Sequence, residues 1–142
     1  HGDTSFIPWS GAYVSGVSLD EYYETVEKMG KNVTKIDKDA MLEYVRTSGG
    51  QVIANKGATF YAVSVAVCKL VATILSSSDS VATVSSMMHG EYGIEDVCLS
   101  TLTLVGPKGV QGKIPMRMTK EEVEKLKASA DALKAVIAQI EH

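Results

Sequence analysis

Residues 81–118 read VATVSSMMHGEYGIEDVCLSTLTLVGPKGVQGKIPMRM, and this stretch decides the fold class of the 142-residue chain. Three runs of strand length within it are rich in Val, Thr, Leu and Met: 81–88, 96–105 and 113–118. Two segments that contain glycines separate the runs: 90–93 and 106–112. Short runs separated by turn residues predict a three-stranded antiparallel meander, with His89 at its first turn.

The middle run of this meander has apolar residues in two phases. Val97 and Leu99 alternate in one phase, whereas Leu102 and Leu104 alternate in the other. Side chains of a strand alternate between two faces, so the two pairs point to opposite sides. We therefore expect a bulge in this strand or burial on both of its faces.

Downstream of the meander, the residues from 119 onward predict an amphipathic helix. Thr119 is a suitable N-cap, and Glu122 stands three residues later, as in a capping box. Apolar residues recur in alternating steps of three and four: Val123, Leu126, Ala130, Leu133, Ile137 and Ile140. This spacing predicts one apolar stripe that packs against the rest of the domain.

Upstream of the meander, residues 1–17 are predicted to be strand and loop, and three helical stretches follow. The first begins at Ser18, where Glu21 completes another capping-box pattern. The second covers 37–55 and is interrupted at Gly49-Gly50, which have poor helix propensity. The third covers 58–77 and is apolar nearly all round, which predicts a helix at the centre of the domain. Helices on both sides of an antiparallel meander predict an α+β fold, in one domain spanning residues 1–142.

Composition and charge limit the partners and the location. The net charge of −3 and the pI of about 5.6 lack the basic footprint of a nucleic-acid-binding protein. The longest apolar-rich stretch, 58–75, contains Ser64 and Lys69, so we expect a buried helix rather than a membrane span. Cys68 and Cys98 lie in apolar stretches and are predicted to be reduced core residues of a cytoplasmic protein.

General catalytic motifs are absent from the sequence. The glycines at 106, 109 and 112 have the wrong spacing for a dinucleotide fingerprint and lead into a predicted strand. No P-loop, Cys-x-x-Cys pair or His-Glu-x-x-His motif is present. The histidines are His1, His89 and the terminal His142, and we predict no metal site. These patterns alone identify no reaction.

Four segments, in order along the chain, form a pattern: HGDTSFIPWS at 1–10, KGATFYAV at 56–63, GEYGIEDV at 90–97 and SADALK at 129–134. In this order they resemble L-lactate dehydrogenases of the lactate/malate dehydrogenase family. The first resembles the segment that carries the active-site histidine, and the second resembles a segment that lines the substrate pocket. The other two are similar to a hairpin and to the final helix of the family. Together they cover essentially the whole chain and imply the C-terminal, substrate-binding domain.

This resemblance implies an NAD-dependent oxidoreductase that interconverts pyruvate and L-lactate. In this family a nicotinamide cofactor transfers a hydride to a 2-oxo acid while a histidine protonates the carbonyl oxygen. His1 matches that histidine, and its imidazole suits acid/base work near neutral pH. Thr59 matches a threonine that lines the substrate side-chain pocket, and Val63 matches an apolar residue that packs on the nicotinamide ring.

The resemblance also implies that other parts of the enzyme lie outside this chain. In the family, the N-terminal Rossmann domain that holds most of the NAD precedes the histidine. So do the aspartate that pairs with the histidine and two arginines that bind the substrate. Arg46 and Arg117 match neither arginine, so we expect the chain alone to be inactive. Expected partners are the 2-oxo or 2-hydroxy acid, the Rossmann domain of the same protein, and further copies in a dimer or tetramer.

Two other functions stay open. A malate or other L-2-hydroxy-acid dehydrogenase shares the fold, and Gly49-Gly50 stands near a position where lactate dehydrogenases often have a tyrosine. More open space there would loosen substrate choice. The second alternative is a non-catalytic interaction or structural domain, although suitable residues at positions 1, 59 and 63 favour an enzyme.

Overall fold

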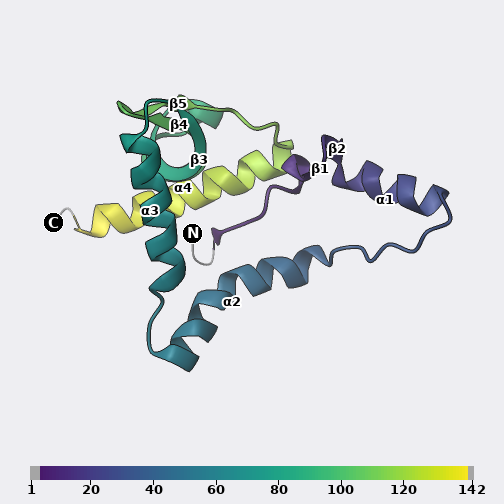
Figure 1. Cartoon of the computed structure of the whole chain (residues 1–142). Coiled ribbons are helices and arrows are strands. Elements are labelled where there is room, and N and C mark those ends of the chain that lie inside the picture. The colour runs from purple at the N-terminus through teal and green to yellow at the C-terminus, as the bar shows by residue number, and fades with distance from the viewer. Residues whose placement is uncertain (1–3, 141–142) are drawn as a thin grey trace.

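The computed structural model describes residues 4–140 and has the α+β architecture expected from the sequence (Figure 1). Its elements, in chain order, are η2 (Trp9–Gly11), β1 (Tyr13–Val14), β2 (Val17–Ser18), α1 (Leu19–Lys28), α2 (Lys38–Lys56), α3 (Tyr61–Leu75), β3 (Ser80–His89), η3 (Glu91–Gly93), β4 (Glu95–Gly106), β5 (Gly109–Lys113) and α4 (Lys120–Ile140). The antiparallel sheet β3-β4-β5 and a small hairpin, β1-β2, are joined by long helices.

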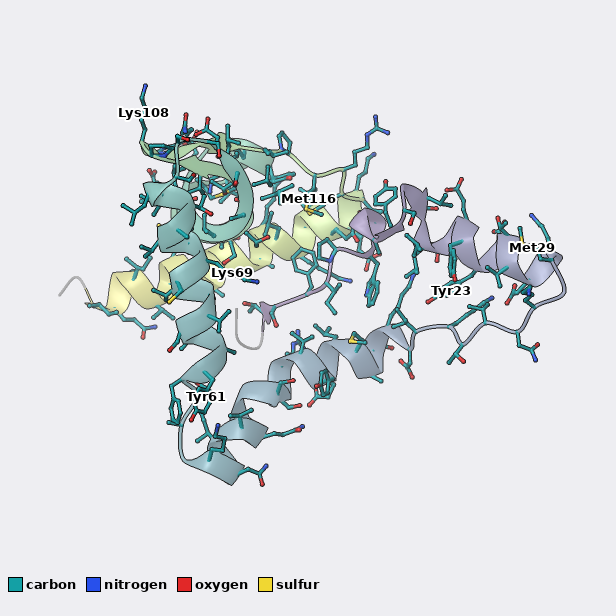
Figure 2. The ribbon with its side chains drawn as sticks, in the orientation of Figure 1. Tyr23, Met29, Tyr61, Lys69, Lys108 and Met116 are labelled. Atoms are coloured by element: carbon teal, nitrogen blue, oxygen red, sulfur yellow. The ribbon has the colours of Figure 1, made fainter. Side chains whose placement is uncertain are left out.

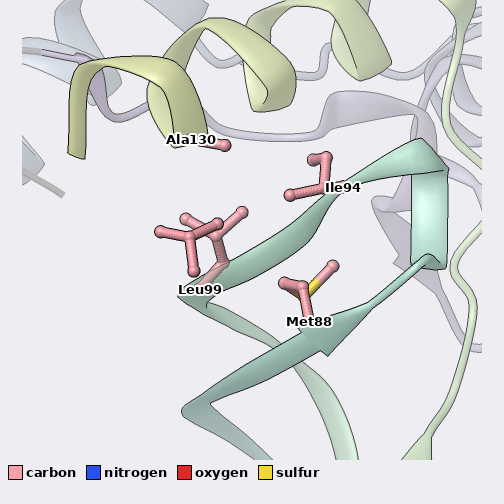
Figure 3. Close-up of a cluster of buried hydrophobic side chains, with 5 residues drawn as sticks. Met88, Ile94, Leu99 and Ala130 are labelled. Carbon is pink, nitrogen blue, oxygen red and sulfur yellow. The ribbon is translucent and has the colours of Figure 1, made fainter. Parts of the chain in front are cut away.

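The main core lies between the β3–β4 hairpin and α4 (Figure 3). Buried side chains of the hairpin pack against Ala130 of α4: Met88, Ile94, Val97 and Leu99. Figure 3 shows Met88, Ile94 and Leu99 extending from the hairpin toward the helix. The apolar stripe predicted for α4 is thus confirmed in its first part, while Ile137 and Ile140 near its end are exposed.

The middle strand is covered on both faces, as the two phases of its apolar residues predicted. Val97, Leu99 and Val105 are buried on one face, and Leu102 and Leu104 are partly buried on the other. The register also shifts between β4 and β5 next to Leu104, so an irregularity of the predicted kind is present too.

The third strand was predicted at 113–118, and this prediction is wrong. β5 comprises Gly109–Lys113, and a tight turn at Pro107 and Lys108 pairs Gly106 with Gly109. Gly109 has a φ of +81°, which glycine tolerates without a Cβ clash. The glycines interpreted as a loop therefore form the turn and the strand itself.

Both predicted capping boxes are present. The Glu21 backbone N–H donates to Ser18 Oγ over 3.3 Å, and the Glu122 N–H donates to Thr119 Oγ1 over 3.2 Å. In each case the glutamate carboxylate accepts the backbone N–H of the capping residue in return. These reciprocal bonds satisfy N–H groups that the first turn of a helix leaves without partners.

The interruption predicted at Gly49-Gly50 is wrong, because α2 runs unbroken from Lys38 to Lys56. Asp37 accepts the backbone N–H groups of Asp39 and Ala40 and so caps the helix at its start. Gly57 ends it in the left-handed conformation with a φ of +81°. Capping at both ends and the intact hydrogen-bond ladder outweigh the propensity cost of two glycines.

The third helix differs from the prediction in its start and in its burial. α3 begins at Tyr61, so residues 58–60 belong to the connection after α2. None of its residues is buried, and its main packing contact is with β4. In Figure 1, α3 reaches the sheet at its C-terminal end, while its N-terminal end meets α2 at a corner away from the sheet. An apolar sequence therefore predicted a core helix where the structure has an exposed one.

The two thiols are likewise exposed rather than buried in the core. Cys68 lies on α3 and Cys98 on β4, and both are free. Within residues 4–140, no single helix is long and apolar enough to cross a membrane. α2 and α3 meet those criteria only as a pair that bends by 120°.

Candidate active site

Residues 4–10 form a segment that lies between α4 on one side and α2 on the other (Figure 1). α4 contacts this segment at two points. Thr4 Oγ1 is 3.0 Å from Ser129 Oγ, and the Ser10 backbone N–H donates to Glu122 Oε1 over 3.0 Å. Because the earlier segment residue meets the later helix residue, the segment runs antiparallel to α4.

α2 contacts the same segment from the opposite side. The Arg46 guanidinium donates to Ser5 Oγ over 3.3 Å and also to the Ser5 carbonyl oxygen. Eight residues earlier on the helix, Lys38 Nζ lies 5.6 Å from the centre of the Trp9 ring. Both contacts are made by side chains open to solvent, where such interactions contribute little to stability.

Glu122 is the most deeply buried charged side chain at this site, with 9% of its surface exposed. Its carboxylate accepts from the Ser10 N–H, from the Ser10 hydroxyl and from the Thr119 N–H. Burial by itself raises the pKa of this carboxyl. The hydrogen bonds from Ser10 and Thr119 outweigh that effect and lower the pKa below its ordinary value. The group is therefore a buried carboxylate that stays ionised at neutral pH.

A cavity of about 380 Å³ borders the segment. Its walls come from the segment, the sheet, the 114–119 connection and α4, and they include Phe6, Leu102, Met116 and Leu133. Figure 2 shows Met116 beside the first turns of α4. The Tyr92 hydroxyl holds the backbone of Met116 by accepting its N–H over 2.7 Å and donating to its carbonyl over 3.2 Å.

The three predicted site residues are placed as follows. His1 lies outside the described residues, three positions before Thr4. Thr59 is exposed in the connection between α2 and α3. Val63 lies in the first turn of α3, with 54% of its surface exposed. Neither Thr59 nor Val63 lines the 380 Å³ cavity, and no hydrogen bond within residues 4–140 joins them to the segment at 4–10. Their roles stay predictions.

No metal site is evident in the part of the chain that the structure describes. Residues 4–140 contain no group of three or more His, Cys, Asp or Glu side chains that could hold an ion.

For a cofactor, the apolar surface around Val63 is the relevant feature. Exposed Phe60 and Tyr61 lie next to it, and Figure 2 shows Tyr61 at the corner where α2 and α3 meet. An exposed apolar patch of this kind can pack against an aromatic ring.

Sequence reasoning missed the contacts that hold the segment. Glu122 was identified only as a cap of its own helix, and Ser10, Ser129 and Arg46 were given no role. The partners are 112 residues apart for Ser10 and Glu122 and 125 apart for Thr4 and Ser129. One available signal was the polar Ser129 beside Ala130 on the apolar stripe of α4, since a buried hydroxyl needs a partner.

Comparison with known proteins gives consistent matches over the whole chain. A family model described as lactate/malate dehydrogenase, alpha/beta C-terminal domain, matches residues 1–142. The L-lactate dehydrogenases of Thermoanaerobacterium saccharolyticum and Acetivibrio thermocellus are 40% and 36% identical to it, each over 99% of this chain and 44% of the relative. The minor L-lactate dehydrogenase of Enterococcus mundtii, solved in a ligand-bound form, has a TM-score of 0.86 at 30% identity and covers 99% of this chain. That match extends over 43% of the solved chain, so the protein described here spans less than half the length of these relatives.

Proposed function

This chain belongs to the lactate/malate dehydrogenase family as its α/β C-terminal domain, and on that premise we propose that it supplies the acid/base and substrate pocket of an NAD-dependent L-lactate dehydrogenase. The observation that carries the proposal is the match of the family model to residues 1–142, together with relatives that are named L-lactate dehydrogenases. Because the chain spans 44% of those relatives, the activity belongs to the chain joined to an N-terminal Rossmann domain.

In the proposed reaction, His1 holds the proton that the substrate receives. As imidazolium it donates this proton to the carbonyl oxygen of pyruvate and becomes neutral imidazole, and in the reverse direction the neutral imidazole takes the proton from the hydroxyl of L-lactate. Bound NADH supplies the hydride that reduces the carbonyl carbon. Thr59 contacts the substrate side chain, and Val63 offers apolar surface to the nicotinamide ring. The exposure of Val63 fits such a contact with a group outside this chain.

By the resemblance to the family, the arginines that bind the substrate carboxylate are expected from the N-terminal part. In this chain the Arg46 guanidinium donates to Ser5, and the backbone carbonyl of Arg117 accepts from the Ser10 hydroxyl. The same reasoning predicts that the 142-residue chain alone has no dehydrogenase activity, because a lone acid cannot orient both reactants.

A malate or other L-2-hydroxy-acid dehydrogenase is the second candidate. The description of the matching family includes malate dehydrogenases. Gly49 and Gly50 are exposed on α2, and a Cβ at either position would have no atom within 4 Å, so the described part of this chain places no restriction on substrate size there. We also propose that the protein forms a homo-oligomer and that it is cytoplasmic. Two unpaired thiols fit the cytoplasm, where thiols stay reduced.

The experiment joins this chain, at His1, to the N-terminal part of the Acetivibrio thermocellus enzyme. NADH oxidation is measured with pyruvate, oxaloacetate and a branched 2-oxo acid, for the hybrid, the unmodified Acetivibrio enzyme and the 142-residue chain alone. We expect pyruvate turnover by the hybrid and none by the chain alone. A hybrid that binds NADH and reduces none of the three acids would refute the proposal and favour a non-catalytic domain.

The unmodified enzyme serves as the matched control for specificity. Both enzymes share the N-terminal part, so any change in the ratio of kcat/KM for pyruvate and oxaloacetate belongs to this chain. A ratio like that of the control supports lactate dehydrogenase. A shift toward oxaloacetate or the branched acid favours the second candidate.

A further inference from the structure

We propose that α4 positions the segment that carries His1, and that Glu122 and Ser129 are positioning residues for the proton transfer. The inference rests on the proposed function, because it takes His1 as the acid/base. Neither side chain is expected to touch the substrate. Both act through the backbone and side chains of residues 4–10.

Glu122 and Ser129 both face the segment from α4. Glu122 and Ser129 are seven residues apart, which is two helical turns, so they lie on the same face of α4 about 10 Å apart. Both are buried, with exposures of 9% and 4%, whereas the adjacent acidic residue Glu121 is exposed and pairs with Lys125. Burying polar groups costs free energy unless they form hydrogen bonds. The polar groups on this face find those bonds in the segment.

The Glu122 carboxylate accepts more hydrogen bonds than a helix cap requires. A capping box needs the carboxylate to accept one N–H, that of Thr119. Glu122 also accepts from the N–H and the hydroxyl of Ser10, which stands 112 residues earlier. The Ser10 hydroxyl is also 3.0 Å from the Arg117 carbonyl oxygen, so it has two acceptors beside the start of α4. The carboxylate thus joins the start of α4 to the end of the segment.

Thr4, which contacts α4, is close to His1 in the sequence. Three peptide bonds separate His1 from Thr4, and an extended chain spans about 10 Å over that length. Among the described contacts of α4, the Thr4–Ser129 contact is therefore the one nearest to His1 in the sequence. The contacts from α2, by Arg46 and Lys38, are exposed, so α4 supplies the firmer side of the site. Proton transfer needs the imidazole within hydrogen-bond distance of the carbonyl oxygen, and a small misplacement lowers its rate.

The kinetic test uses Glu122→Gln and Ser129→Ala in the hybrid enzyme described above, with Glu121→Gln as the matched control. We expect each of the two variants to lower kcat with pyruvate by about tenfold or more, while the Kd for NADH and the fraction of folded enzyme stay unchanged. Adding Ser10→Ala to Glu122→Gln is expected to lower kcat by less than the two single effects combined, because the two side chains share a contact. Unchanged kcat in both variants of an active hybrid would overturn the proposal and leave the proposed function standing.

A second test needs no activity and uses the 142-residue chain. Backbone ¹⁵N heteronuclear NOE values report the order of residues 4–10 relative to α4. We expect lower values for 4–10 in Ser129→Ala and Glu122→Gln, and unchanged values in Glu121→Gln. Equal order in all three variants would overturn the proposal. A folded hybrid without turnover would instead remove the proposed function, while this measurement would still show whether α4 holds the segment.

Discussion

Replacing Glu122 by Ala removes the contact on which the arrangement of the segment and α4 depends. The carboxylate accepts three hydrogen bonds: from the Ser10 N–H over 3.0 Å, from the Ser10 hydroxyl and from the Thr119 N–H over 2.8 Å. The alanine variant leaves the N–H groups of Ser10 and Thr119 without this acceptor, while the Ser10 hydroxyl keeps the Arg117 carbonyl. Thr119 Oγ1 still accepts the backbone N–H of residue 122, so the variant loses one half of the capping box together with the bonds from Glu122 to the segment.

The expected cost follows from these bonds. A hydrogen bond to a charged acceptor contributes roughly 1.5–3 kcal/mol, and loss of a helix N-cap interaction costs about 1 kcal/mol. The three bonds share one carboxylate and are not additive, and the donors on Ser10 and Thr119 regain water in part. We therefore expect Glu122→Ala to lower the free energy of unfolding by about 3 kcal/mol. For a chain of this size that corresponds to a fall in Tm of about 10 °C.

Urea unfolding followed by circular dichroism measures this loss, with Glu121→Ala as the control. Glu121 is exposed, and within residues 4–140 its side chain forms an ion pair with Lys125, so its replacement is expected to cost less than about 0.5 kcal/mol. The pH dependence gives an independent check. The folded-state pKa of Glu122 is lowered, so its contribution is complete above the ordinary carboxyl value of 4.5 and is lost as pH falls through the lowered value. The stability difference between the wild-type chain and Glu122→Gln should therefore shrink between pH 5 and strongly acidic pH. A Glu122→Ala variant as stable as Glu121→Ala would refute the reasoning.

Three further outcomes are expected. Leu99→Ala should lower the free energy of unfolding by about 2–4 kcal/mol, because Leu99 is buried against α4. Leu75→Ala, at a position 80% exposed, should change the free energy of unfolding little. Equal effects of the two substitutions would contradict the assigned core. A maleimide reagent should label both Cys68 and Cys98 in the native chain at similar rates, and labelling that requires denaturant would show that they are buried. The chain alone should self-associate through its exposed apolar surface, and Val67→Ser on α3 should reduce this self-association. Size-exclusion chromatography with light scattering measures the mass of the species formed. A wild-type chain that stays monomeric at high concentration would contradict the prediction.

Features that depend on neighbouring residues were predictable from the sequence. The capping boxes at Ser18 and Thr119 and the turn after His89 involve groups a few residues apart, so the spacing alone indicates them. The third strand was misplaced because Gly109 and Gly112 were interpreted as loop residues. In the structure both glycines pair with β4, and the backbone hydrogen bonds of that ladder outweigh the low strand propensity of glycine.

Features that depend on distant residues were not predictable in this way. An apolar helix such as α3 predicts burial, but its pattern does not say which surface covers it, and within residues 4–140 none covers it fully. The attachment of Thr4 and Ser10 to α4 also left little signal, because the partners are more than 100 residues apart. The resemblance to the family supplied the candidate roles of His1, Thr59 and Val63, which residue patterns alone did not.

The central claim is that His1 is the acid/base of a 2-oxo acid reductase, and one substitution tests it most directly. His1→Asn in the hybrid enzyme, with NADH and pyruvate, is followed by NADH fluorescence for binding and by absorbance for turnover. We predict an unchanged Kd for NADH and a fall in kcat of about a hundredfold or more, which is the usual contribution of a positioned acid. A His1→Asn hybrid that turns over pyruvate at the rate of the unmodified hybrid would contradict the account.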